Sequence, residues 1–200
     1  MSVVCKMLNV KRMLVWLSRI HRCRGFGVQS PWAYRMVRYV INEHYPYYAY
    51  EDLRAAYPRM DADTRRLCEL SLRLANSVRP AWVAVDDACG EEFRAYIKAG
   101  CRSVSFLKDI GECRTKNNGE RIFAVLSTQE GLSETFYKVA DAANNGSVAL
   151  IMGIHGNKAA RMLWREVVSG VKNVVTFDLY YCGLVFFDDK RFKQNYIINF

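Results

Sequence analysis

The 200-residue chain lacks several features that would assign it quickly to a class of protein. No apolar run approaches the roughly 20 residues that a membrane-spanning helix requires. The first twenty residues do not resemble a signal peptide, because Lys6, Lys11, Arg12 and Arg19 interrupt them and no small-residue cleavage site follows. The seven cysteines are odd in number and never spaced as CxxC, which argues against a disulfide framework and against a zinc site. We therefore expect a cytoplasmic protein without a bound metal.

Acidic residues are also missing from the start of the chain. None precedes Glu43, and the basic residues before it are Lys6, Lys11, Arg12, Arg19, Arg22, Arg24, Arg35 and Arg38. The net charge of +9 therefore belongs almost entirely to this region. Such a region attracts nucleic acid, anionic lipid or an acidic partner, although a solvated helix face beside a neutral domain has the same composition.

The N-terminal region up to residue 60 is expected to form a basic helical extension. Apolar residues at helical spacing, which predict an amphipathic helix, are Val3, Met7, Val10, Leu14 and Leu17. A basic amphipathic helix can lie on a membrane surface, but docking of the apolar stripe on the chain's own domain is the favoured interpretation. Ser30 and Pro31 then begin a second helix. The tyrosine-rich residues 45–58 are expected to form a loop packed on the domain.

Residues 61–200 alternate strand and helix signals. Apolar runs typical of buried strands occupy 81–86, 104–107, 122–126, 148–152, 174–179 and 184–187, with a last apolar run at 196–200. Helical patterns occupy 61–78, 91–99, 131–143 and 157–169. The last strands flank Cys182-Gly183 like a hairpin. This order predicts an α/β domain with a Rossmann-like, mostly parallel sheet, helices on both faces and an antiparallel C-terminal hairpin.

Glycine is scarce where an α/β fold usually binds its cofactor. The turn after the first strand contains only Gly90, with Asp86 and Asp87 before it. Together with Glu91 and Glu92, these carboxylates would repel a pyrophosphate, which argues against a nicotinamide or flavin dehydrogenase. For the two glutamates, stabilisation of the following helix N-terminus is a sufficient explanation.

Several segments resemble a bacterial family of class I S-adenosylmethionine-dependent methyltransferases that has an added N-terminal helical segment. Residues 24–32 (RGFGVQSPW) are similar to an H-G-I-H-S-P-F motif of that family, and Ile154-His155 matches as well. The segments most similar to the family's last strands are 174–187 (VVTFDLYYCGLVFF) and 196–200 (YIINF). The resemblance implies S-adenosylmethionine as cofactor.

The resemblance assigns the cofactor site to Asp86, Asp87, Gly90, Asp109 and Ser127. The chain departs from the family's motif at most of these positions. The first turn keeps the acid and one glycine, Asp109 comes two residues later than the expected ribose-binding acid, and Ser127 stands where the family has an aspartate. These changes favour weakened or lost methyltransferase activity.

A candidate for a general base is His155, at the end of a predicted strand. It has no carboxylate close by in the sequence, so a hydrogen-bonded structural role is the favoured interpretation.

Three functions remain open. The first is a methyltransferase of unknown substrate, with S-adenosylmethionine bound by Asp86, Gly90 and Asp109. The second is a non-catalytic binding or scaffold protein with a basic N-terminal surface for an anionic partner. The third is direct nucleic-acid binding through the N-terminal arginines and tyrosines.

Overall fold

The computed structural model describes residues 10, 13–25, 27–109, 112, 119–129, 131–172 and 174–200, without the side chains of residues 23 and 24. Its centre is a seven-stranded sheet in the order β2-β1-β3-β4-β6-β5-β7. The strands are β1 (Trp82–Val85), β2 (Ser105–Phe106), β3 (Ile122–Ser127), β4 (Ser147–Met152), β5 (Val174–Asp178), β6 (Cys182–Phe187) and β7 (Gln194–Ile197). All neighbouring pairs are parallel except those of β6, which runs antiparallel to both β4 and β5.

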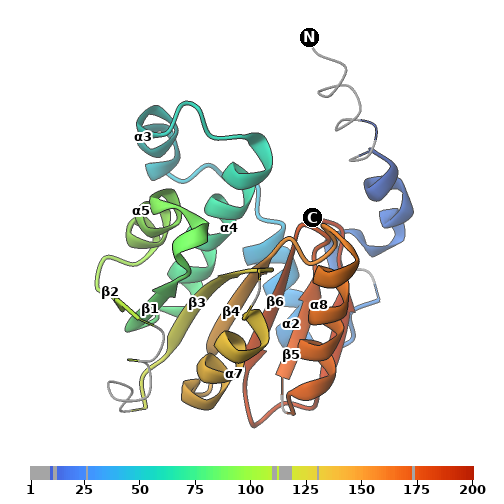
Figure 1. The fold of residues 1–200 in the computed structure, drawn as a ribbon. Coiled ribbons are helices and arrows are strands. Elements are labelled where there is room, and N and C mark those ends of the chain that lie inside the picture. The colour runs from blue at the N-terminus through green and yellow to red at the C-terminus, as the bar shows by residue number, and fades with distance from the viewer. Residues whose placement is uncertain are drawn as a thin grey trace.

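The helices cover both faces of this sheet (Figure 1). They are α2 (Pro31–Met36), η2 (Val37–Ile41), α3 (Ala49–Ala56), α4 (Ala62–Val78), α5 (Glu91–Gly100), α7 (Leu132–Ala142) and α8 (Lys158–Gly170), with short turns of helix at η1 (Ile20–Gly25) and η3 (Asp87–Cys89). Helices α2, η2, α4 and α5 pack on one face, and α7 and α8 pack on the other. The predicted fold class, with its parallel sheet and antiparallel C-terminal hairpin, is confirmed.

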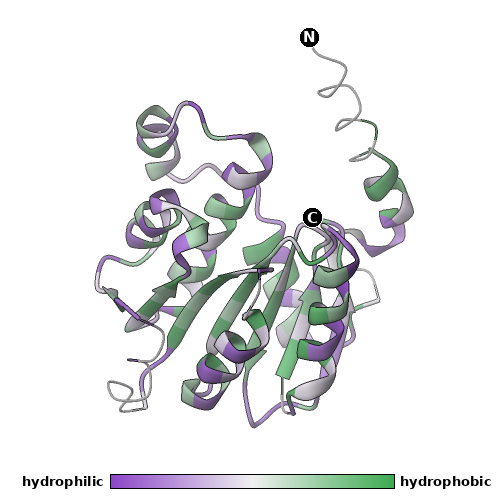
Figure 2. Cartoon of the chain, viewed as in Figure 1, coloured by the Kyte–Doolittle hydropathy of each residue, from purple (hydrophilic) through white to green (hydrophobic). Residues whose placement is uncertain are grey.

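Strand β3 shows why the sheet needs both helical layers. All six of its residues are buried. Successive side chains of a strand point to opposite faces, so Phe123 and Val125 enter the core beneath α4 and α5, whereas Ala124 and Leu126 enter the core beneath α7 and α8. Figure 2 shows the resulting pattern, with apolar strands between helices that turn polar residues outward.

Helices α2 and α4 begin where the sequence patterns place them. The Ser30 side chain accepts a hydrogen bond from the amide of Ala33, and Pro31 occupies the first helical position of α2. The Asp61 carboxylate accepts bonds from the amides of Asp63 and Thr64 at the start of α4. Each cap satisfies amides that lack a partner within the helix.

Two local expectations are wrong. The tyrosine-rich residues 45–58 are not entirely a loop, because α3 lies within them. Its Tyr50 is 6% exposed and packs on the core beneath α4. The second error concerns the hairpin: Cys182 and Gly183 are the first residues of β6, and the turn comes earlier, at 179–181.

The N-terminal apolar stripe is not docked where it can be described. Residues 13–18 are helical and lie beside the C-terminus, outside the layers that cover the sheet (Figure 1). The exposed fractions are 52% for Val10, 58% for Leu14 and 47% for Leu17. The expected docking of these three residues on the domain is therefore wrong; Val3 and Met7 lie outside the described residues.

Candidate functional site

The carboxyl ends of β1, β2 and β3 enclose a small pocket of about 220 Å³. This edge of an open α/β sheet is where ligands of such folds bind. Four of the five predicted cofactor residues line the pocket: Asp86, Asp87, Asp109 and Ser127. The structure thus brings together residues that are up to 41 positions apart in the chain.

The partly buried Asp86 carboxylate accepts three hydrogen bonds from groups of the protein. Its Oδ2 accepts a hydrogen bond from the Ser127 hydroxyl at 2.7 Å and one from the Ser127 amide at 3.2 Å. Its Oδ1 accepts from the amide of Ala88 at 3.1 Å. The carboxylate therefore ties the end of β1 to the end of β3, which leaves it fewer free acceptor positions for a ligand hydroxyl.

Gly90 has a structural role in the same turn and does not line the pocket. Its φ of +76° lies in the left-handed region that favours glycine, and it caps the start of α5. A Cβ built on Gly90 would come within 2.5 Å of the Glu92 carboxylate. The Glu92 side chain thus occupies the space beside the glycine.

Cys89 in this turn is not a nucleophile. It is 3% exposed, and burial, reinforced by the charges of Asp86 and Glu92, raises the pKa of its thiol to about 12. A thiol with such a pKa stays protonated at neutral pH, and the thiolate is the reactive form.

His155 lies three residues beyond the end of β4 and has a carboxylate partner that is distant in the sequence. Its Nε2 is 2.7 Å from Oδ2 of Asp178, the last residue of β5. The imidazole also stacks on the Tyr180 ring, with the ring centroids 5.0 Å apart. No local pattern could have revealed this pair, because the two residues come from different strand ends.

Asp178 also holds the N-terminal segment. Arg19 donates to its Oδ1 at 2.9 Å and to its backbone carbonyl at 3.0 Å, and the guanidinium lies over the Tyr180 ring. The Arg19 side chain is 11% exposed. Because the carboxylate is shared between a guanidinium and an imidazole, its clearest role is to fasten residue 19 to the edge of the sheet.

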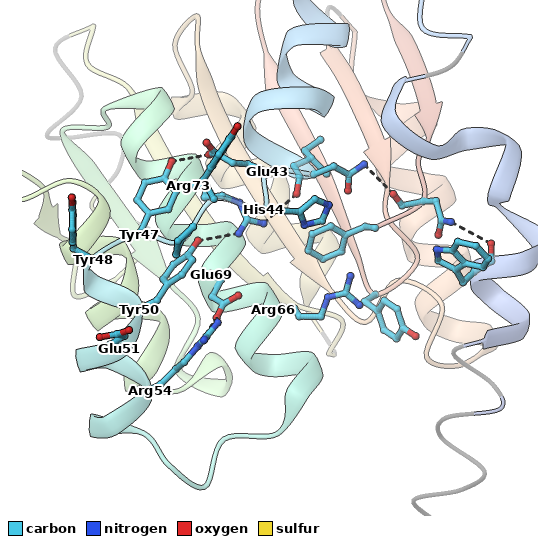
Figure 3. Close-up of a pocket in the computed structure, with 18 of the residues that line it drawn as sticks. Glu43, His44, Tyr47, Tyr48, Tyr50, Glu51, Arg54, Arg66, Glu69 and Arg73 are labelled. Atoms are coloured by element: carbon cyan, nitrogen blue, oxygen red, sulfur yellow. Dashed lines mark hydrogen bonds and ion pairs between the residues drawn. The ribbon is translucent and has the colours of Figure 1, made fainter.

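A much larger cavity, of about 1320 Å³, was not anticipated from the sequence (Figure 3). Its walls are formed by helix α4, the tyrosine-rich segment, the C-terminus and three N-terminal residues, Met13, Val15 and Trp16. Much of its charge is already paired. Arg54 donates to Glu69 at 2.7 Å, Tyr47 donates to Glu43 at 2.8 Å, and Arg66 lies over the Phe200 ring.

The floor of this cavity includes a buried arginine. Arg73 of α4 donates to the carbonyls of Val40 and Ile41 and to the Tyr50 hydroxyl. Burial raises the pKa of the Tyr50 phenol, against the lowering effect of Arg73, so Tyr50 stays neutral. These contacts join η2, α3 and α4, which explains Arg73 without a ligand.

Among the described residues, no group of three or more His, Cys, Asp or Glu side chains is arranged to hold a metal ion. None of the helices in the described part of the chain combines the length and the apolar character that a bilayer crossing needs.

The comparisons with known proteins bear on the fold. No family model and no curated protein matches the chain. A crystal structure of a Corynebacterium glutamicum protein from a structural genomics consortium is similar, with a TM-score of 0.51 and 14% sequence identity. The match covers 78% of this chain and 97% of that protein. The chain has a Rossmann-like α/β fold.

Proposed function

We propose that this protein is a methyltransferase-like α/β protein that no longer transfers methyl groups and works by binding an anionic partner through its basic N-terminal region. The observation that supports the loss of methyl transfer is the hydrogen bonding of the Asp86 carboxylate. In the family that the sequence resembles, an acid in this turn belongs to the cofactor site. Here both oxygens of Asp86 accept hydrogen bonds from protein groups.

The size of the pocket supports the same conclusion. Small-molecule sites usually enclose about 300–1,000 Å³, and the pocket at the strand ends encloses about 220 Å³. The position that the family gives to an aspartate holds Ser127, and this serine supplies two of the donors that occupy Asp86. These residues do not fit S-adenosylmethionine as a resident cofactor.

The distribution of charge along the chain supports the binding of an anionic partner. The region before Glu43 contains only basic charges, whereas the rest of the chain is nearly neutral. An anionic partner bound there would displace counterions or pair with arginines, so its affinity should fall steeply as salt rises.

Calorimetric titration with S-adenosylmethionine tests the first half. We expect no saturable heat with the unaltered protein. Ser127→Ala removes the hydroxyl donor to Asp86 Oδ2, so any residual binding should be stronger in this variant than in the unaltered protein. Saturable micromolar binding by the unaltered protein, lost in Asp86→Ala, would contradict the proposal.

An active methyltransferase is the second candidate. One observation favours it: Asp86, Asp87, Asp109 and Ser127 lie around a single pocket at the ligand-binding edge of the sheet. The titration just described separates the two candidates, since only an active enzyme requires the cofactor.

A further inference from the structure

The described residues expose most of their large apolar side chains in one short region. Of the thirteen large hydrophobic residues that are exposed, all but Met162, Phe192 and Ile197 lie between positions 10 and 48. The densest group, called here the N-terminal surface, consists of Val10, Met13, Leu14, Trp16, Leu17 and Ile20. Each of these six side chains is 40–58% exposed.

The arrangement of this group follows helical geometry. Val10, Met13, Leu14 and Leu17 have the spacing i, i+3, i+4, i+7, which places four side chains on one face of a helix. Residue 10 and residues 13–18 are helical. An apolar face of this kind is unfavourable in water, since burying it would release free energy roughly in proportion to the apolar area removed from water.

The N-terminal surface is held in place by the body of the protein. Besides the Arg19–Asp178 pair, the Asn199 side chain donates to the carbonyl of Trp16 at 3.2 Å, and the Asn199 amide donates to the carbonyl of Arg22. These bonds fasten the C-terminal end of the helical segment and the turn after it beside the end of the chain. Met13 and Trp16 also line the large cavity, whereas Val10, Leu14 and Leu17 do not and stay 47–58% exposed.

The charge around this face indicates what covers it. In the sequence, Lys11, Arg12 and Arg22 lie among and just after these apolar residues, and no acidic residue occurs before Glu43. Arg22 is exposed at the C-terminal end of this segment. An aliphatic helical face with a tryptophan beside it and basic residues nearby in the sequence is the combination that lies in the interface of an anionic bilayer.

We propose that the N-terminal surface docks the protein on the surface of an anionic phospholipid membrane. The aliphatic face would enter the boundary between headgroups and acyl chains, Trp16 would sit at the headgroup level, and the basic residues would contact lipid phosphates. Nucleic acid fits less well, because a phosphate backbone offers nothing to four aliphatic side chains. The inference rests on the binding half of the proposed function and is independent of the state of the cofactor pocket.

Co-sedimentation of the full chain with vesicles tests this proposal. We expect binding to vesicles of phosphatidylcholine mixed with phosphatidylglycerol and little binding to phosphatidylcholine alone. Leu14→Glu combined with Leu17→Glu should reduce binding at least tenfold, because carboxylates are then placed in the apolar face and repelled by the lipid. Arg22→Glu should reduce it about fivefold or more, from the roughly 1 kcal/mol that each basic residue contributes near such a surface.

Phe192→Glu is the matched control. Phe192 is 89% exposed but lies outside the N-terminal surface, so this variant should bind vesicles as the unaltered protein does. Because the substituted leucines are exposed, the thermal unfolding of the double variant should be unchanged, which separates lost docking from lost folding.

Two results would overturn the membrane proposal. One is the absence of binding to anionic vesicles. If, in that case, the double variant also converts a dimer to a monomer, the N-terminal surface is covered by a second copy of the chain. The other is vesicle binding that the double variant leaves intact. Salt-sensitive retention on an immobilised polyanion, unaffected by the double variant, would preserve the proposed function while rejecting the lipid as the partner.

Discussion

The N-terminal surface and the sheet body (α2, η2 and residues 62–200) use the same kinds of apolar residue in opposite ways. In the sheet body, Leu74 of α4 is fully buried, and at the edge where ligands usually bind Asp86 and Ser127 are hydrogen-bonded to each other. In the N-terminal surface, Leu14 is 58% exposed. The difference teaches that the apolar residues of the body are covered by the protein itself, whereas those of the N-terminal surface are half exposed.

The largest expected effect comes from a residue that joins the helical segments of the N-terminal half to α4. Arg73→Ala should lower the free energy of unfolding by about 3–5 kcal/mol, because two carbonyls and the Tyr50 hydroxyl lose their buried partner. Urea unfolding followed by circular dichroism measures this change. Arg79→Ala is the control, since the Arg79 side chain bonds to the neighbouring Asn76 and is exposed. Equal stability of the two variants would show that η2 and α3 are not part of the cooperative unit.

The second prediction concerns the contact that holds the N-terminal surface on the sheet body. Asp178→Ala removes the carboxylate shared by Arg19 and His155, and we expect a loss of about 2 kcal/mol together with faster tryptic cleavage at Arg19 and Arg22. Asp188→Ala removes a local pair with Arg191 and serves as the control, with little change expected in either measurement. Cleavage that is unchanged in Asp178→Ala would mean that Asp178 does not hold the segment.

The buried thiols of the sheet body should make its stability depend on pH. All four described cysteines of the sheet body are buried, and the pKa of Cys89 rises from its ordinary 9.0 to about 12 on folding. Above pH 9 the unfolded thiol ionises while the folded one does not, so this stabilisation is present below pH 9 and is lost progressively up to pH 12. The expected slope is up to about 1.4 kcal/mol per pH unit for one such thiol.

Urea unfolding at several alkaline pH values measures this slope. Burial raises the pKa of Cys68 and Cys182 as well, so part of the slope should remain in Cys89→Ala. A slope identical to that of the unaltered protein would show that Cys89 does not contribute.

Much of the fold could be predicted from the sequence, because its signals are local. Buried strands such as 122–127 are short apolar runs, and Ser30 and Asp61 cap helices within three residues of themselves. The helix α3 was missed because residues 45–58 contain five tyrosines and two prolines, which are not typical of a helix. The helix is held in part by the bond between Tyr50 and Arg73, which lies 23 positions away.

The candidate site was predictable only in part, because most of its contacts join residues that are far apart in the sequence. Strand ends meet at one edge of the sheet, so Asp86, Asp109 and Ser127 could be expected to lie near one another. Nothing in the sequence indicates that the Ser127 hydroxyl donates a hydrogen bond to Asp86, or that Asp178 pairs with both Arg19 and His155. The sequence also does not indicate that residues within 13–16 line the same cavity as residues 199–200. These contacts depend on tertiary packing.

The smallest effect is expected for truncation of a leucine in the N-terminal surface, which can be compared directly with truncation of a leucine in the sheet body. Leu14→Ala should change the free energy of unfolding by less than about 0.5 kcal/mol, because an exposed side chain gives up little burial on truncation. Leu74→Ala should cost about 2–5 kcal/mol, since it leaves a cavity in a closed core. Differential scanning calorimetry of both variants, first alone and then with anionic vesicles, measures the contrast. A large loss in Leu14→Ala without lipid would mean that the N-terminal surface is covered by the protein itself, and the distinction between the two regions would then disappear.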